Sequence, residues 1–507
     1  MKKLLYTLVL GVSVSLAGQD ALQKTKLSKE QALQDYEQYI ELLTETHPGL
    51  YRYTNTQIML GRIDSLRETI TDSIPFYTLY KKIAWLSASI RCSHSYVIPK
   101  ADFNSFLLKE AKSIPFYTMP IEGRFYVLFN GSSDTSIKPG FEITSINGSP
   151  ITKIAEEIGN HFWVDGKIEL AKNSVLQGNL FRAYYYSFID SSQVLDFGLV
   201  DRDGNKIEKR LASVSALTAM RNYKKNPVNR EVFKLYRTKP PKWDLKILED
   251  TPSTAVLTIP GFGDKKVKSE EDAAAFMTRF MNKVMAKLEK KQIKNLIVEL
   301  RYNRGGWDIM GTTLMSYLMK QNTPIPYYGP SYAITNNSKF LAYSDLNGYD
   351  KARLDEELEL QPDGTFKLRA EYNASFAPIK KRENAFKGNV FILMDEYTSS
   401  AAAEFCAVAK SNKIATLIGQ ETNGTYGGLN ASSFINLTLK NSGIVVNTPL
   451  VRNHLAVDES LQPLERGVLP DHAVGFNLEA VLVRKDTQME FLKELIRSEA
   501  NQSSGSR

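Results

Sequence analysis

The chain has 507 residues, of which 43% are hydrophobic and 24% charged, and its formal net charge is +8 at pH 7. These values are typical of a globular protein, exclude an intrinsically disordered one and predict two to four domains. The basic residues are scattered among acidic ones, as in 265–272, which indicates a solvated surface and no nucleic-acid partner. Only Cys92 and Cys406 are present, so a disulfide framework is excluded, and whether these two pair is left open.

The first residues combine two lysines, an apolar stretch from Leu4 to Leu16 and then small residues. This pattern predicts that residues 1–18 are a secretory signal peptide and that the protein is secreted or periplasmic. No later apolar run reaches the ~18 residues that a membrane span needs. We therefore expect no integral membrane segment after removal of the signal.

Residues 19–112 are predicted to form an N-terminal helical domain, because apolar residues recur there at spacings of three and four. Residues 113–212 instead show short alternating runs separated by Gly, Asn and Asp, which predicts a small antiparallel unit. Within it, IKPGFEITSINGSPI (137–151) resembles the PDZ domains of processing proteases, with Phe141-Glu142 in place of the usual Gly-Asp pair. A generic β-hairpin is the alternative interpretation.

Residues 213–480 are predicted to be one α/β domain with a polar insertion at about 330–385, and residues 481–507 a C-terminal helix and a disordered tail. Strands are expected at 253–260, 295–303, 390–394 and 413–420, with helices at 270–290 and 308–320 between them. Repeated strand–helix units predict a mostly parallel sheet. Ligand sites in such sheets lie at the carboxyl ends of the strands.

Two adjacent serines, Ser399 and Ser400, stand where a predicted strand, VFILM, turns into an alanine-rich helix. One interpretation is helix capping by a hydroxyl. The other is a nucleophile, because the N–H groups and the positive end of a helix dipole are what an acyl-transfer oxyanion needs. Glycine-rich turns follow two neighbouring strands, at 301–306 and 419–428, and they let backbone N–H groups approach a substrate. These residues alone leave both interpretations open.

Several motifs then occur in one order: RYNRGG, TSSAAAEF, GQETNGTYG, NSGIVVNTP and LERGVLPDHAV. Together they resemble the C-terminal processing peptidase and tricorn protease superfamily over roughly 250–475. The resemblance implies an α/β protein with a crotonase-like ββα spiral catalytic core, preceded by an N-terminal helical domain and a small PDZ-like β domain. It also implies a serine peptidase.

Carried over residue by residue, the resemblance implies that Ser400 is the nucleophile. It implies an oxyanion hole made by the backbone N–H of Ala401 and that of Gly305 or Gly306. A serine hydroxyl is a weak nucleophile and needs a base.

The processing-peptidase branch takes its base from a lysine in the third strand's loop, but Thr425 stands there, and Lys410 lies at the wrong end of the predicted helix. The tricorn branch uses a histidine preceded by a serine, and Ser93-His94 matches that pair. The resemblance therefore implies that His94 is the base. The other histidines lack such support: His47, His161, His454 and His472.

The same branch orients its site with a glutamate near the C-terminus, which implies that Glu465 holds the serine–histidine network. A surface acid in a loop is the alternative. The sequence departs from the family pattern at Ala403, Arg304 and Cys92. These departures remove no catalytic group, but they keep open the alternative that the chain is a catalytically degenerate member of the superfamily.

The resulting hypothesis is an exported serine endopeptidase that acts on polypeptide or peptide substrates through an acyl-enzyme. No cofactor and no metal are expected, because no HExxH or CxxC cluster is present. Two alternatives stay open: a catalytically degenerate ligand- or peptide-binding protein on the same scaffold, and an enzyme acting on non-peptide acyl substrates.

Overall fold

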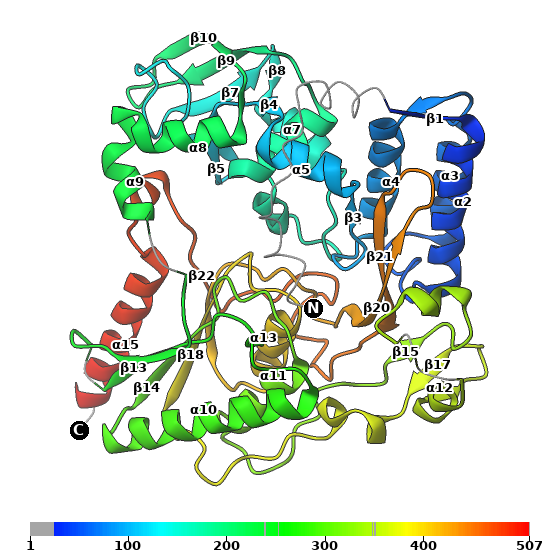
Figure 1. Ribbon diagram of the computed structural model, residues 1–507. Coiled ribbons are helices and arrows are strands. Elements are labelled where there is room, and N and C mark those ends of the chain that lie inside the picture. The colour runs from blue at the N-terminus through cyan, green and yellow to red at the C-terminus, as the bar shows by residue number, and fades with distance from the viewer. Residues whose placement is uncertain (1–24, 238–239, 252, 347, 349–350, 506–507) are drawn as a thin grey trace.

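The computed structural model describes residues 25–505 except 238–239, 252, 347 and 349–350 (Figure 1). The predicted signal peptide, residues 1–18, lies outside the described residues. The fold is mixed α/β, as expected. Within the described part of the chain, none of the helices has the length and apolar character needed to cross a membrane.

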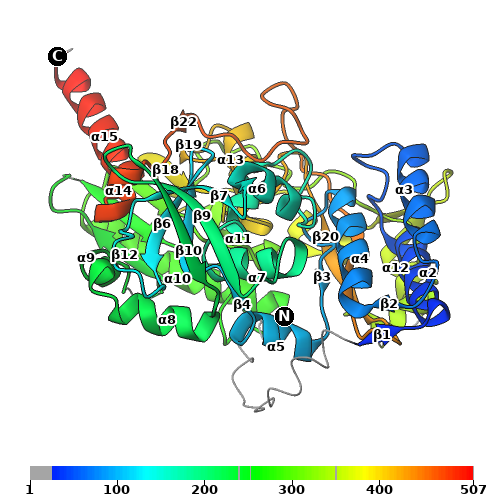
Figure 2. The ribbon, with the colours of Figure 1, turned by 90° about the horizontal axis from the view of Figure 1, so that it is seen from above.

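An N-terminal layer of helices comprises α2 (Lys29–Thr46), α3 (Thr56–Glu68), α4 (Phe76–Ile90) and α5 (Ala101–Lys109). The first of them begins at Ser28, whose side chain and that of Gln31 form a capping box. The apolar faces of these helices share one core with β20 (Asn430–Thr438) and β21 (Val445–Arg452), through residues such as Leu437 and Val446. Figures 1 and 2 show α2, α3 and α4 at one end of the molecule, beside this hairpin.

A five-stranded antiparallel path in the order β10-β9-β7-β6-β5 occupies the region predicted as a small β unit. Its strands are β5 (Phe116–Ile121), β6 (Arg124–Asn130), β7 (Glu142–Ile146), β9 (Val194–Val200) and β10 (Lys206–Ala212). The helices α6 (Ile151–Gly159) and α7 (Gly178–Phe188) pack on it around a core that includes Phe181 and Phe197. The likeness of this unit to a PDZ domain stays a prediction.

The central sheet has the order β12-β13-β14-β18-β19-β22, and all its strand pairs but the first are parallel. Its strands are β12 (Asp244–Ile247), β13 (Thr254–Thr258), β14 (Asn295–Glu299), β18 (Asn389–Met394), β19 (Thr416–Gly419) and β22 (His472–Ala473). One face packs against α10 (Glu270–Lys290), α11 (Asp308–Ser316) and α13 (Ala401–Ser411), and the other against α15 (Thr487–Gly505). The four inner strands β13, β14, β18 and β19 are buried on both faces and have the largely apolar sequences that parallel sheets require.

A second sheet packs against the N-terminal layer of helices. It has the order β16-β17-β15-β21-β20, and β3 (Val97–Ile98) pairs with β21. The predicted polar insertion supplies three of its strands, β15 (Tyr332–Ala333), β16 (Leu358–Leu360) and β17 (Phe366–Leu368), as well as α12 (Lys351–Glu357). This insertion is therefore an ordered part of the sheet.

Short elements complete the described chain. They are β1 (Lys26–Leu27), β2 (Ile74–Pro75), β4 (Lys112–Ser113), β8 (Ser149–Pro150), β11 (Val214–Ser215), α8 (Ala216–Lys225), α9 (Arg230–Tyr236), α14 (Leu478–Val483) and the 3-10 turns η1 (Leu170–Ser174), η2 (Pro227–Asn229), η3 (Lys339–Tyr343), η4 (Ala370–Tyr372) and η5 (Ala374–Phe376).

Candidate active site

Ser400 stands at the start of α13, just beyond the carboxyl end of β18, with φ 53° and ψ −135°. Such a backbone conformation is strained for a non-glycine residue, at a cost on the order of 1–3 kcal/mol. Its side chain makes no capping hydrogen bond, so the capping interpretation fails for Ser400. Instead its Oγ lies 3.4 Å from Nε2 of His94.

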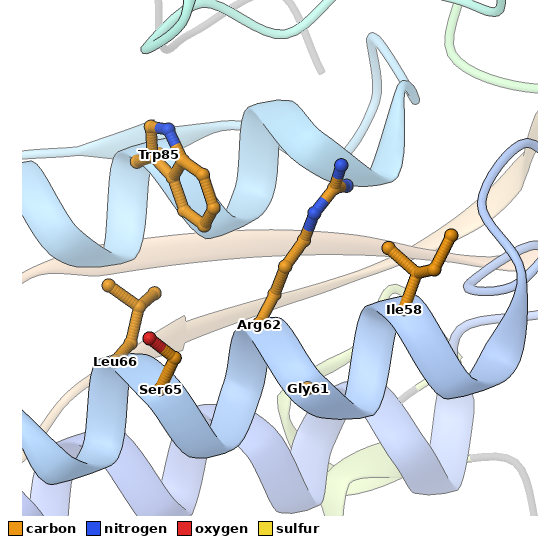
Figure 3. Close-up of a pocket in the computed structure, with 6 residues that line it drawn as sticks. All are labelled: Ile58, Gly61, Arg62, Ser65, Leu66 and Trp85. Atoms are coloured by element: carbon orange, nitrogen blue, oxygen red, sulfur yellow. The ribbon is translucent and has the colours of Figure 1, made fainter.

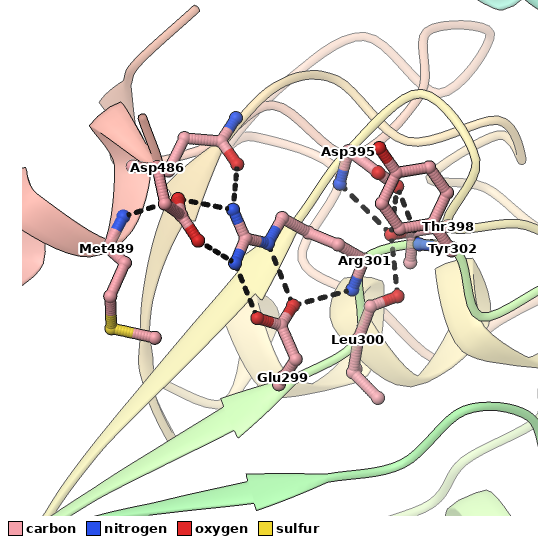
Figure 4. A network of polar contacts seen from close by, with 9 residues as sticks. Glu299, Leu300, Arg301, Tyr302, Asp395, Thr398, Asp486 and Met489 are labelled. Carbon is pink, nitrogen blue, oxygen red and sulfur yellow. Dashed lines mark hydrogen bonds and ion pairs between the residues drawn. The ribbon is translucent and has the colours of Figure 1, made fainter. Parts of the chain in front are cut away.

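The turn that carries Ser400 is fixed from two sides. Thr398 Oγ1 donates to the carbonyl of Leu300 at 3.0 Å, and the N–H of Ser399 donates to the carbonyl of Asn303 at 3.0 Å. Asp395 accepts from the N–H of Tyr302 at 3.1 Å (Figure 4). The loops after β14 and β18 therefore hold each other in place.

His94 reaches the sheet from the N-terminal layer. The helix α4 ends at a left-handed residue, Arg91, with φ 59°, and the chain then turns through His94 into β3, which pairs with β21. From β21, Asn447 donates through Nδ2 to the carbonyl of His94 at 2.5 Å. The ring of Phe434 on β20 lies with its centroid 5.4 Å from that of the imidazole. The hairpin thus fixes both the backbone and the ring.

A buried aspartate completes this network. Ser93 Oγ lies 3.5 Å from Nδ1 of His94 and donates to Oδ2 of Asp165 at 2.5 Å, while the N–H of Ser93 donates to Oδ1 at 3.0 Å. Asp165 is only 2% exposed. The order of contacts is Ser400, His94, Ser93, Asp165.

Sequence reasoning missed Asp165, which lies in WVDGK, a loop without a recognised motif. One signal was present: the glycine that follows. Gly166 has φ 53°, and a Cβ there would lie 2.2 Å from the carbonyl oxygen of Glu465. Only glycine lets the loop approach so closely.

Glu465 itself does not join the network, contrary to what the resemblance implied. Its carboxylate pairs with Lys167 at 2.9 Å, and this hydrogen bond, before all other causes, lowers the pKa of Glu465. Its backbone carbonyl accepts from the N–H of Lys167 at 2.8 Å. Because the side chain turns toward solvent and Lys167, the carboxylate beside Ser93 is that of Asp165.

Two of the three predicted oxyanion donors are free to act. The N–H of Gly305 donates to Oδ1 of Asn303 at 2.9 Å, so it is engaged. Among the described residues, no protein acceptor receives the N–H of Gly306 or that of Ala401. A Cβ on residue 305 would lie 2.7 Å from Cβ of Ser400 and 2.9 Å from the nitrogen of Ala401. Glycine at 305 is therefore required for this approach.

The electrostatics favour a neutral base. Burial lowers the pKa of His94, and the charge of Asp165 opposes this shift. Burial, followed by the charge of Asp165, raises the pKa of Cys92 to about 11. Both cysteines are free and buried, so the pairing left open by the sequence does not form in this structure.

Aromatic side chains stand exposed on the loop beside this network. Tyr302 is 59% exposed and Trp307 38%. The ring of Tyr302 stacks on Tyr397 at 5.1 Å, and the guanidinium of Arg304 lies 5.7 Å from the Tyr397 ring centroid. These groups offer a surface on which an extended chain could lie.

The other candidates from the sequence are engaged elsewhere. Thr425 donates to the carbonyl of Gly428 at 2.6 Å, and Lys410 pairs with Asp471 at 2.5 Å. Each remaining histidine contacts a group outside this network. His47 contacts Ser95, and His161 contacts the carbonyl of Glu157. His454 contacts the carbonyl of Pro330, and His472 contacts the ring of Phe491.

A groove between α3 and α4 lies apart from this network (Figure 3). Its volume is about 310 Å³, and its lining comprises Ile58, Gly61, Arg62, Ser65, Leu66 and Trp85. This lining pairs no nucleophile with a base. The chemistry-bearing groups are those around Ser400.

Comparisons with known proteins show what the chain is similar to. The model of peptidase family S41 matches residues 253–474. The structure is similar to mature CPAF, with 16% sequence identity, coverage of 92% of this chain and 96% of that chain, and a TM-score of 0.59. It is also similar to mature CPAF complexed with lactacystin, with 16% identity, coverage of 93% of this chain and 98% of that chain, and a TM-score of 0.59. The tricorn protease also matches, with 16% identity and coverage of 93% of this chain and 37% of that chain, but the TM-score of 0.39 is too low to support a conclusion. No curated protein matches.

Proposed function

Because the model of peptidase family S41 matches residues 253–474, we propose that this chain is a serine peptidase of that family, an exported endopeptidase whose catalytic pair is Ser400 and His94. The observation that carries this proposal is the 3.4 Å contact between Ser400 Oγ and His94 Nε2. The strained backbone at Ser400 and the free N–H groups beside it support the same assignment.

The hydrogen bonds around Ser93 select the tautomer of the base. An ionised carboxylate only accepts hydrogen bonds, so the single proton of the Ser93 hydroxyl points to Asp165. The oxygen of Ser93 is then free to accept from Nδ1–H of His94. The proton of the neutral imidazole is thereby held on Nδ1, and Nε2 is left as the acceptor that faces Ser400.

The reaction proceeds from this arrangement. His94 Nε2 takes the proton of Ser400 as Oγ attacks the peptide carbonyl carbon, and the N–H groups of Gly306 and Ala401 donate to the oxyanion. The tetrahedral intermediate collapses, His94 gives its proton to the leaving amine, and an acyl-enzyme remains. Water, deprotonated by His94, then releases the acid. Ser93 and Asp165 are positioning residues.

The finer features of the fold are part of the proposal. The order of the motifs from RYNRGG to LERGVLPDHAV supports a crotonase-like core, and the segment 137–151 supports a PDZ-like role for β5–β10. Export rests on residues 1–18, and cell fractionation with that segment deleted tests it.

The test of the catalytic assignment compares two neighbouring serines. We expect Ser400→Ala to lower kcat/KM on casein or a tagged peptide by about 10⁴-fold or more, because no nucleophile remains. Ser399→Ala is the matched control and should keep most of the activity.

A fluorophosphonate probe should label the wild-type chain at Ser400, as peptide mapping would show. Undiminished cleavage by Ser400→Ala would refute the proposal. Absence of both labelling and cleavage in the wild-type chain would instead favour a binding protein on this scaffold.

A further inference from the structure

Three side chains of the kinds that bind transition metals meet at the proposed base, which is one of them. The Cys92 thiol, the His94 imidazole and the Asp165 carboxylate each place one ligand atom within 4.8 Å of the other two. Cys92 is fully buried and Asp165 is 2% exposed. No sequence motif marks this group, because its members come from segments 72 positions apart, as the Ser93–Asp165 contact shows.

The backbone holds the three groups in place before any ligand arrives. Cys92 and His94 lie on one tight turn, in which the N–H of Ser95 donates to the carbonyl of Cys92 at 3.0 Å. The loop that carries Asp165 is tied to the same turn, because the N–H of Gly166 donates to the carbonyl of Arg91 at 3.0 Å. Such preorganisation lowers the entropic cost of binding.

We propose that Cys92, His94 and Asp165 form an inhibitory site for a thiophilic divalent cation, Zn²⁺ in particular. Zinc is held by sulfur, nitrogen and carboxylate oxygen at bond lengths that put tetrahedral ligands about 3.3–3.8 Å apart. Closing the present spacing to that value takes side-chain movements of about 1 Å. Three protein ligands leave the fourth position for water.

A cation in this site would stop the peptidase by removing its proton acceptor. If Nδ1 of His94 binds the metal, the imidazole proton moves to Nε2, which then cannot accept from Ser400. If Nε2 binds it, that acceptor is lost directly. The thiol of Cys92 releases its proton to solvent on coordination, so thiolate and carboxylate together balance the 2+ charge. Removal of the cation by a chelator reverses each step.

Binding is tested on the full chain without reference to activity, using Co²⁺ as the probe. We expect one equivalent of Co²⁺ to produce a thiolate-to-metal absorption band that Zn²⁺ abolishes. Cys92→Ala should lose the band, whereas Cys406→Ala, the matched variant at the other buried cysteine, should keep it. Thermal unfolding without metal shows that both variants are folded. A band retained by Cys92→Ala, or no binding of Co²⁺ or Zn²⁺ by the wild-type chain, would overturn the proposal.

The inhibitory effect rests on the proposed function, and it is measured in a peptide-cleavage assay separate from the binding assay. At free Zn²⁺ ten times its Kd, the rate of peptide cleavage should fall about tenfold, and a chelator should restore it. Cys92→Ala should need at least about tenfold more Zn²⁺ for half inhibition than Cys406→Ala needs. If both variants respond alike, the site is refuted while the peptidase stands. If the chain binds Co²⁺ through Cys92 but never cleaves peptide, the proposed function fails and the site stands.

Discussion

At the scale of single residues, the direction in which the Ser93 hydroxyl donates its proton determines which nitrogen of His94 is protonated. Ser93 donates to Asp165 and can therefore accept from His94, which keeps Nε2 unprotonated toward Ser400. A side chain at 165 that donates to Ser93 would reverse this order. The hydroxyl of Ser93 would then donate to Nδ1, and the proton of the ring would sit on Nε2.

Asp165→Asn introduces such a donor, and we expect it to lower kcat by about 10²–10⁴-fold with little change in KM. The rate of fluorophosphonate labelling at Ser400 should fall in parallel, which a purely structural role would not produce. Glu465→Gln is the control and should change kcat by no more than about threefold, because an exposed ion pair contributes little. Equal effects of the two substitutions would contradict this account.

Gly305→Ala tests the close approach at the oxyanion hole. The added Cβ meets Ser400 Cβ at 2.7 Å and the carbonyl of Ser399 at 2.8 Å, and φ there is +83°. We expect a loss of activity of at least about 10²-fold and a loss of unfolding free energy of about 2 kcal/mol. Gly61→Ala, on α3 with nothing within 4 Å of the new Cβ, should instead raise stability by about 0.5–1 kcal/mol. Activity assays and urea unfolding of both variants check this.

At the scale of elements, a charged cluster joins the end of β14, the loop after β18 and the start of α15. Arg301 binds the carboxylates of Glu299 and Asp486 at 2.5 Å and 2.7 Å (Figure 4). Beside it, burial and then the charge of Asp395 raise the pKa of Glu396 to about 7. Oε2 of Glu396 has no hydrogen-bond partner among the described residues.

A carboxyl whose pKa is higher in the folded than in the unfolded state destabilises the fold as pH rises between the two values. For Glu396 this window runs from its ordinary value of 4.5 to about 7. We expect Glu396→Gln to be more stable than the wild-type chain by about 1–2 kcal/mol at pH 8 and equal to it near pH 4. Denaturant unfolding at both pH values measures this, and a difference independent of pH would contradict it.

At the scale of the whole molecule, the N-terminal helices and the β20–β21 hairpin share one core although they lie at opposite ends of the sequence. Leu437→Ala, at a side chain 1% exposed, should cost about 2–4 kcal/mol. Because the core is shared, hydrogen exchange should speed up in α4 as well as in β20. Faster exchange in β20 alone would show that the two parts unfold separately.

The succession of strands and helices in the central domain could be predicted from the sequence, because buried parallel strands and amphipathic helices have recognisable hydrophobic patterns. The motifs also pointed to Ser400, Ser93 and His94, which the structure brings together. Asp165 was missed, since a loop aspartate shows no periodicity, its partner lies on another segment, and the glycine that follows it does not by itself mark a site. The strands of the polar insertion were missed because strands of three residues, such as Leu358–Leu360, are too short for an alternating pattern to be recognised.

The pairing of β3 with β21 has a consequence for the polypeptide during its synthesis. Translation delivers the imidazole early, the hydroxyl 306 positions later, and the strand that steadies the imidazole later still. A chain that ends before β21 therefore lacks the strand that holds His94 in place, even where it contains both His94 and Ser400. We therefore expect peptide cleavage only from a chain that has been completed and folded.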